Sequence, residues 1–242
     1  MKRLVIAAVG LVIVAMPAAA AACGGGQATP TLSPIPTEVA ASPTAARTAA
    51  AAPSAAAAGT VPKGWERHRT ANFQIDLPET WVFFDPTQQT YEALLEMLRR
   101  QAPELVSRAE EYVAPNLDEI ALFAFDTESA NILHNLVISF QEWPSPTTLP
   151  LLINQLEAVW SAHPGRRLVS SDSDLTVGGL SAGRVVLSMT ANRSDVILVE
   201  YFVLSEPTAA FILTFASGTS SFERLEPVFE QIAQSFRVLE SP

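Results

Sequence analysis

The chain has 242 residues and a formal net charge of −10. The charge is concentrated from Lys63 onward, where 12 Lys and Arg residues stand against 24 Asp and Glu residues, a net charge of −12. An acidic domain with no Lys or Arg run longer than two residues excludes nucleic-acid binding, which needs a basic surface, and disfavours electrostatic attachment to anionic lipid.

The first 22 residues are organised like an export signal. Lys2 and Arg3 give a positively charged start, residues 4–16 are apolar, and residues 17–22 are one Pro followed by Ala only, as expected before a cleavage site. We therefore expect residues 1–22 to be a signal peptide.

Cys23, the only cysteine of the chain, follows this segment directly. A single cysteine in an exported protein cannot form an internal disulfide. Residues 20–23 (Ala-Ala-Ala-Cys) resemble the lipobox of bacterial lipoproteins, with Ala20 in place of the usual Leu. The resemblance implies that Cys23 receives a diacylglyceryl group. Two acyl chains, such as palmitate, are enough to hold a protein on the extracytoplasmic face of the cell membrane.

Two other interpretations of this segment remain open. Residues 20–22 are also an A-x-A site for ordinary signal peptidase, which would release a secreted protein. Residues 4–22 are also just long enough for an uncleaved membrane helix, although Pro17 and the alanines make its last third a poor span.

Residues 24–62 read as a disordered tether. Of these 39 residues, 32 are Ala, Pro, Thr, Gly or Ser, two are charged and none is aromatic. Such a composition cannot bury enough apolar surface to offset the entropy of ordering. With Cys23 acylated, residues 23–62 would hold a globular domain of residues 63–242 away from the membrane.

The first half of that domain predicts short strands and helices. Alternating apolar residues predict strands at 73–77 and 81–84. The sequence Asp85-Pro86-Thr87-Gln88 predicts the start of a helix, with an N-cap, a proline in the first turn and a capping-box glutamine. A short helix from Pro103 and strands near 119–126 and 133–141 follow.

The second half is patterned more clearly. Apolar residues recur with helical spacing over 147–163, and His163-Pro164-Gly165 ends this helix. Strands are expected near 167–177, 184–190, 196–204 and 209–216, and the short polar turns between the last three predict an antiparallel meander. A final helix carries Phe222 to Phe236 on one face, with Pro227 inside it or near its true start.

Strands and helices in blocks predict an α+β fold with a mainly antiparallel sheet. The strands at 196–204 and 209–216 are almost wholly apolar, so both of their faces must be covered. A three-layer α-β-α sandwich satisfies this requirement.

Three short segments resemble a known family. Residues 73–81 (FQIDLPETW), 175–183 (LTVGGLSAG) and 229–236 (FEQIAQSF) are similar to parts of PsbP-like domains. These domains include the extrinsic photosystem II subunit, the Ran-binding Mog proteins and many bacterial lipoproteins. The resemblance implies the same fold over about residues 65–238. Because family members serve as adaptors, assembly factors and envelope-associated binding modules, some in envelope lipid traffic, it also implies a role without catalysis.

One motif suggests a hydrolase but fails its structural requirement. Residues 179–183 match G-x-S-x-G, which in α/β-hydrolases presents the serine on a turn from a strand into a helix. Here Ser181 is followed by a strand pattern, and no histidine occurs after His163. The segment is better explained as a glycine-rich turn between two strands, and no catalytic residue is predicted.

No metal or cofactor site is predicted either. His68, His134 and His163 are far apart in sequence, and His68 lies in a charged segment typical of a solvated surface. The sequence Asp172-Ser173-Asp174 begins like a calcium loop but lacks the later ligands, which favours a polar turn.

Trp143 is the one candidate for partner recognition, because it lies in a loop with two prolines between a strand and a helix. The same residue could equally close the sheet edge over the core. The main hypothesis is a non-enzymatic binding or scaffold lipoprotein whose partner is a protein or an envelope molecule. The alternatives are a carrier of an apolar envelope ligand in a cleft between helix 147–163 and the sheet and, less favoured, a hydrolase.

Overall fold

The computed structural model describes residues 60–101, 103, 106–128, 134–143, 145–161, 165–191 and 194–239. Cys23, His163, the signal peptide and the tether up to residue 59 lie outside these residues. The predictions made for them stay predictions.

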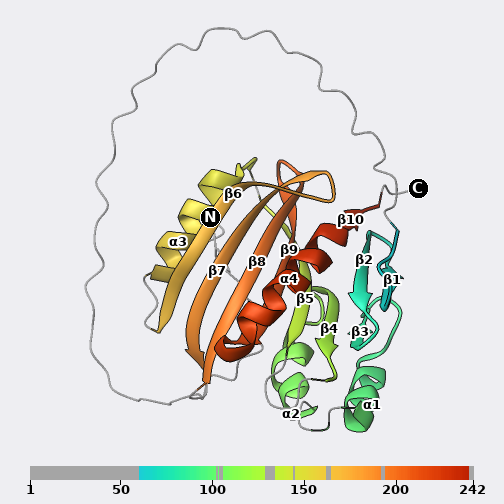
Figure 1. The fold of residues 1–242 in the computed structure, drawn as a ribbon. Helices are drawn as coiled ribbons and strands as arrows, with labels where there is room; N and C mark the ends of the chain where they lie inside the picture. The colour runs from blue at the N-terminus through green and yellow to red at the C-terminus, as the bar shows by residue number, and fades with distance from the viewer. Residues whose placement is uncertain are drawn as a thin grey trace, which may run out of the picture. The chain divides into compact units, whose positions relative to one another are not determined.

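Ten strands form two antiparallel sheets in this part of the chain (Figure 1). The strands are β1 (Trp65–Arg69), β2 (Phe73–Pro78), β3 (Trp81–Phe84), β4 (Ile120–Asp126), β5 (Asn135–Glu142), β6 (Arg166–Val177), β7 (Leu180–Ala191), β8 (Ser194–Glu206), β9 (Ala209–Gly218) and β10 (Arg237–Val238). The large sheet has the order β3-β4-β5-β9-β8-β7-β6, and the small sheet has the order β1-β2-β10. The meander expected for the last strands is present and includes β6.

The helical elements cover both faces of the large sheet. They are α1 (Tyr91–Gln101), α2 (Val106–Arg108), the π-helix η2 (Ala109–Val113), the 3-10 helix η3 (Ala114–Asn116), α3 (Leu149–Ser161) and α4 (Thr219–Ser235). α4 and the small sheet pack on one face of the large sheet. α3 covers β7 to β9 on the other face, and α1 and η2 cover β3 to β5 there. The α+β class and the three-layer arrangement are as predicted.

The apolar patterns of β8 and β9 explain the three layers. In β8, Ile197, Val199 and Tyr201 pack under α4, whereas Leu198 and Phe202 pack under α3. Successive side chains of a strand point to opposite faces, so a continuous apolar run requires a cover on each side.

The beginning of α1 differs from the prediction. The helix begins at Tyr91, and Thr90 caps it by accepting a hydrogen bond from the Ala93 amide at its Oγ1. The buried Asp85 instead accepts hydrogen bonds from Thr87 and Gln88 within a turn. The capping groups recognised in the sequence therefore stabilise a turn that precedes the helix.

Two further predictions are wrong. His68 is not solvated: it belongs to β1, a strand missed in the sequence, and is buried against Phe83 with ring centroids 4.0 Å apart. Burial lowers the pKa of His68 because desolvation penalises its charged form. Asp172-Ser173-Asp174 is not a turn: it lies within β6 at a register shift against β7, where the Asp174 amide donates to Asp172 Oδ1.

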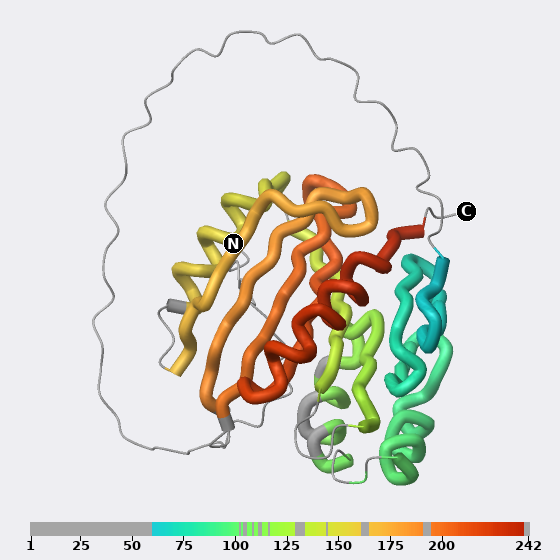
Figure 2. Tube along the Cα trace, viewed as in Figure 1, coloured from blue at the N-terminus to red at the C-terminus, as the bar shows by residue number. Residues whose placement is uncertain are grey.

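The turn between β6 and β7 contacts the end of α4. Gly178 and Gly179 form it with φ values of +63° and +86°, and Figure 2 shows this hairpin reaching toward the C-terminal end of α4. A Cβ placed on Gly178 would lie 2.2 Å from the carbonyl oxygen of Phe236, whereas one on Gly179 would meet nothing within 4 Å. Glycine at position 178 is thus required by backbone conformation and by space.

Glu200 is buried in the middle of β8, on the α3 face of the sheet. It pairs with Val185 on β7 and Thr214 on β9. Within the described part of the chain no hydrogen bond reaches its carboxyl group, and Arg166 is the only charge that affects it. Burial raises the pKa of Glu200 to about 7, because the charged form loses its hydration.

We expect Gly178→Ala to lower the free energy of unfolding more than Gly179→Ala does. Both substitutions put alanine into the left-handed region, which costs about 1–2 kcal/mol. Only the first adds an overlap with the Phe236 carbonyl, which costs about 1–3 kcal/mol more. Urea denaturation of the two variants measures the difference, and equal midpoints would contradict the tight contact.

We expect the stability of the protein to fall as the pH rises from about 4.5 to about 7 because of Glu200. The folded state keeps the Glu200 proton up to about pH 7, whereas the unfolded state releases it near the ordinary glutamate pKa of 4.5. The difference corresponds to about 3 kcal/mol. Urea midpoints across this range should fall less steeply in Glu200→Gln. The control Glu223→Gln, at an exposed glutamate of α4, should follow the wild type.

Candidate functional site

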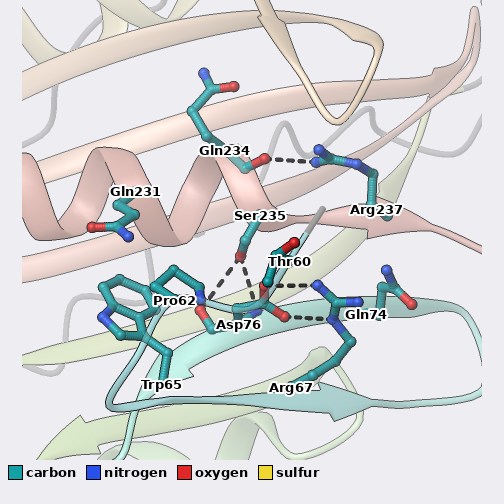
Figure 3. A pocket seen from close by; sticks show the side chains of 10 residues that line it. All are labelled: Thr60, Pro62, Trp65, Arg67, Gln74, Asp76, Gln231, Gln234, Ser235 and Arg237. Carbon is teal, nitrogen blue, oxygen red and sulfur yellow. Dashed lines mark hydrogen bonds and ion pairs between the residues drawn. The ribbon is translucent and has the colours of Figure 1, made fainter. Parts of the chain in front are cut away.

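A polar hollow of about 190 Å³ lies where the small sheet meets the end of α4 (Figure 3). It is lined by Thr60, Pro62, Trp65, Arg67, Gln74, Asp76, Gln231, Gln234, Ser235 and Arg237. We call it the junction pocket. It takes residues from the two ends of the domain, and two of the segments that resemble PsbP-like domains contribute to its wall.

Strand alternation places the β2 residues of the pocket. Phe73, Ile75 and Leu77 are buried in the main core, so Gln74 and Asp76 point to the opposite face of the small sheet. The register of β1 with β2 sets Arg67 beside Asp76.

Arg67 and Asp76 form a two-pronged ion pair at the base of the pocket. Arg67 Nε donates to Asp76 Oδ1 at 2.7 Å, and Arg67 Nη2 donates to Asp76 Oδ2 at 2.9 Å. The Asp76 side chain is only 6% exposed and that of Arg67 is 29% exposed. The hydrogen bond to Asp76 raises the pKa of Arg67. This geometry fixes the planes of both groups.

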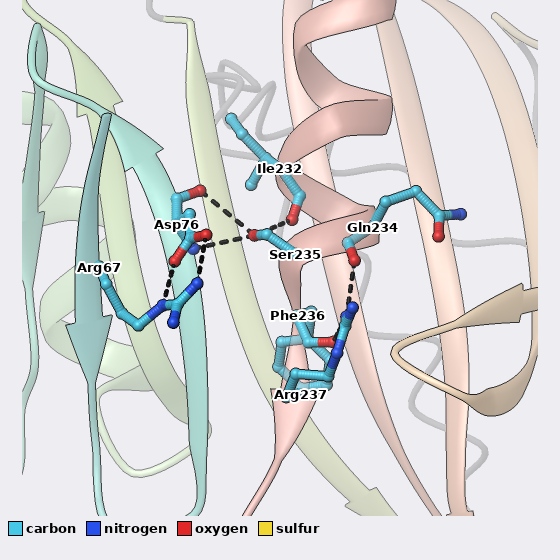
Figure 4. Close-up of polar contacts among 7 residues, drawn as sticks. All are labelled: Arg67, Asp76, Ile232, Gln234, Ser235, Phe236 and Arg237. Atoms are coloured by element: carbon cyan, nitrogen blue, oxygen red, sulfur yellow. Dashed lines mark hydrogen bonds and ion pairs between the residues drawn. The ribbon is translucent and has the colours of Figure 1, made fainter. Parts of the chain in front are cut away.

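Ser235 connects the last turn of α4 to β2. Its Oγ accepts a hydrogen bond from the Asp76 amide at 2.8 Å and donates to the Ile232 carbonyl at 2.6 Å (Figure 4). The Asp76 amide has no strand partner on this side, because β10 pairs only with Phe73 and Gln74. The hydroxyl therefore takes the place of a missing ladder bond.

Arg237 closes the C-terminal end of α4. Its Nη1 donates to the carbonyls of Gln234 and Phe236 at 2.6 and 2.7 Å. Arg237 Nε is buried and has no hydrogen-bond partner in the described structure. Gln234 Nε2 donates to the Thr176 carbonyl at 3.1 Å, which ties α4 to β6. A cation at a helix C-terminus is favoured by the partial negative charge of the last carbonyls.

The junction pocket offers a ligand charged groups and hydrogen-bonding groups. Its ionisable lining groups are Arg67, Asp76 and Arg237, and the Asp76 carboxylate is engaged by Arg67. The lining contains no histidine, cysteine, lysine or tyrosine. In the residues that the structure describes, no three His, Cys, Asp or Glu side chains are grouped so as to hold a metal ion.

The residues singled out in the sequence do not come together. Ser181 is the second residue of β7, after the Gly178-Gly179 turn, so the G-x-S-x-G match runs from a glycine turn between two strands into β7. Trp143 follows β5: its amide donates to the Thr208 carbonyl at 2.7 Å, and its half-buried side chain packs on the α3 side of the core.

His134 does not line the junction pocket either, and it lies directly before β5. It is buried, and its Nδ1 lies 3.5 Å from Asp126 Oδ2. The backbone amide of Asp126 donates to the His134 carbonyl at 2.9 Å. These contacts belong to the β4–β5 hairpin, and neither ring nitrogen of His134 has a hydrogen-bond partner in the described structure.

The junction pocket was not predicted from the sequence. The alternation of Gln74 and Asp76 with buried neighbours was visible, but β1 was missed and with it the partner of Asp76. The bond between Asp76 and Ser235 joins residues 159 positions apart, which no local pattern reveals.

Comparison with known proteins finds likeness in structure only. No family model matches the sequence, and no curated protein is detectably similar. The structure is similar to the cyanobacterial PsbP (CyanoP) of Synechocystis sp. PCC 6803, with 12% identity and a TM-score of 0.47 over 77% of this chain and 98% of that one.

Two further solved structures are similar in the same way. LpqN of Mycobacterium tuberculosis, described as involved in cell envelope biogenesis, has 13% identity and a TM-score of 0.45 over 69% of this chain and 83% of that one. The immunity protein TplEi of Pseudomonas aeruginosa has 12% identity and a TM-score of 0.42 over 73% of this chain and 97% of that one. At these identities the likeness concerns the fold alone.

The described helices include none with the length and apolar character needed to cross a membrane.

We expect Ser235→Ala to lower the free energy of unfolding by about 1–3 kcal/mol, because the buried Asp76 amide loses its acceptor. Ser220→Ala, at an exposed serine of the same helix, is the matched control and should be nearly neutral. Thermal unfolding followed by circular dichroism compares the two. Equal effects would show that the Ser235 hydroxyl does not join α4 to β2.

Proposed function

We propose that this protein is a lipoprotein held on the extracytoplasmic face of the cell membrane through acylated Cys23, and that its domain acts as a non-enzymatic binding or scaffold module. The junction pocket is the observation that supports the binding role. It is a preformed polar hollow whose charged groups are fixed in place by Asp76, Gln234 and Phe236.

A catalytic role has less support. Ser181 is in a strand and not at a helix N-terminus, which is the position that the G-x-S-x-G mechanism requires. The junction pocket also lacks a group suited to abstract a proton, because its one carboxylate is engaged in the ion pair with Arg67.

An apolar-ligand carrier has less support as well. The proposed cleft between α3 and the sheet is filled by Leu149, Leu152, Ile153, Leu156 and Trp160, all at most 7% exposed. A Cβ on Gly183 would lie 2.5 Å from Ile153 Cδ1. At this contact the helix is too close to the sheet to admit a ligand.

Trp143 remains a second candidate contact for a partner protein. Its side chain packs on the core and is only partly buried, beside the turn between β8 and β9. The exposed Leu151 lies near the beginning of the following helix, α3. An aromatic side chain in such a position can serve as an anchor at an interface.

The anchor is supported by the sequence: a segment patterned like an export signal, a cysteine directly after it and a following stretch rich in small residues and proline. A single cysteine cannot form an internal disulfide, and a diacylglyceryl thioether gives it a function at that position.

We expect Cys23→Ser to move the full-length protein out of the membrane fraction of the producing bacterium. The wild type should carry a mass increment of acyl chains on Cys23, and the control Ser33→Ala should stay in the membrane. Cell fractionation and intact-mass spectrometry measure both properties. A wild-type protein found unmodified in the medium would support the secreted form instead.

Cross-linking of the wild-type protein in the same membranes tests the binding role. We expect discrete cross-linked adducts of the anchored protein with another envelope component. Recovery of the protein only as an uncross-linked monomer, under conditions that cross-link known complexes, would contradict the scaffold proposal.

A further inference from the structure

The outer face of the small sheet gathers positive charge. Arg67 of β1 is opposite Asp76 on β2, and Arg69 of β1 is opposite Gln74. On the other side of β2, Arg237 of β10 is also opposite Gln74. Directly paired residues of neighbouring strands point to the same face. Three arginines and one aspartate therefore share the face that contains the junction pocket.

This local charge is opposite to that of the domain. From residue 63 onward the chain has a net charge of −12, whereas the paired positions on this face have three cationic groups and one anionic group. Glu66, which also belongs to β1, is opposite the core residue Leu77 and so points to the other face. The negative net charge of the domain repels anions from most of its surface. A locally positive hollow is therefore the place where an anion would bind in preference to the rest of the surface.

The three arginines are not equally engaged. Arg67 is fixed by Asp76 at the base. The Arg69 side chain is exposed and has no hydrogen bond or ion pair within the described residues. Arg237 uses only Nη1 for the carbonyls of α4. Gln74 lies between Arg69 and Arg237, and no hydrogen bond to its side-chain amide is found in the described structure.

The hollow beside these groups has the size of a small ligand. Its volume of about 190 Å³ exceeds the roughly 150 Å³ in which an engineered protein cavity holds benzene. Trp65 forms one wall, and the polar side chain of Gln231 is on the α4 side (Figure 3). A ring-sized polar molecule fits such a space.

We propose that the junction pocket, together with the neighbouring Arg69 on the same face of the small sheet, binds an anionic group, a carboxylate or a phosphate, on a small polar molecule. Arg237 and Gln74 of the pocket lining and the adjoining Arg69 are its main contacts. The anion accepts charge-assisted hydrogen bonds from the guanidinium groups and a hydrogen bond from the Gln74 amide. The inference deepens the binding role proposed above and rests on it, but it does not require acylation of Cys23.

Soluble probes of different chemistry test this inference on the full-length protein purified in a polyoxyethylene detergent. The probes are sn-glycerol 1-phosphate, D-glucuronate, uncharged D-glucose and short-chain phosphatidylglycerol below its micelle concentration, each titrated by calorimetry. We expect at least one acid to bind and D-glucose not to bind, with affinity that falls as salt is added. Binding of the free acids points to a soluble metabolite, and binding of the lipid alone points to a membrane headgroup.

Two variants locate the binding in the junction pocket. Gln74→Glu puts a carboxylate between Arg69 and Arg237, and we expect it to weaken acid binding at least tenfold. Arg69→Gln, which removes an exposed side chain without internal contacts, should weaken it several-fold while the protein stays folded. The matched controls are Gln155→Glu on α3 and Arg167→Gln on β6, both exposed and both on other elements.

The outcomes are distinct. Affinity unchanged in both pocket variants, equal binding of D-glucose, or no binding of any acid at millimolar concentration would overturn the inference. If the protein still gives cross-linked adducts in membranes while no acid binds, only the ligand class proposed here fails. If both experiments fail, the binding role itself fails.

Discussion

The close approach of Gly178 to the carbonyl of Phe236 fixes where α4 ends. The β6–β7 turn occupies the space beyond the helix, and no larger residue than glycine fits there. Because the helix stops at this point, Ser235 faces the unpaired amide of Asp76, and Arg237 returns to cover the last carbonyls. The small sheet, the large sheet and α4 are thereby held in one arrangement, and the junction pocket is the space that this arrangement leaves.

The large sheet shows how a fully covered sheet limits function. Its central strands are apolar on both faces and are enclosed by α4 on one side and α3 on the other. Glu200 is a polar group on the α3 face of this interior, and its elevated pKa of about 7 reflects the cost of burying an acid. With the sheet faces filled by packed side chains, recognition is left to the margins, where the small sheet and the ends of helices meet solvent.

Much of the fold could be predicted from sequence because its signals are local. The spacing of apolar residues in α3 and α4 and the continuous apolar runs of β8 and β9 are strong patterns, and they determined the α+β class and the three layers. The missed features depend on distant partners. The sequence of β1 contains Glu66, Arg67 and Arg69 and is typical of a solvated segment. In the fold, Arg67 pairs with Asp76 and His68 packs on Phe83, and neither partner is close in sequence. The junction pocket requires the contact of Asp76 with Ser235, which only the folded chain provides.

The position of Thr60 and Pro62 in the wall of the pocket has a mechanical consequence. The chain upstream enters the fold at this point, so tension applied from its N-terminal side reaches β1 before any other strand. β1 pairs with β2 alone and lies at an edge of the small sheet, so a pull at Thr60 loads the start of that ladder first. The Arg67–Asp76 pair is two residues beyond Trp65, the first residue to pair. Tension applied at Thr60 would therefore distort the pocket before it affected the large sheet.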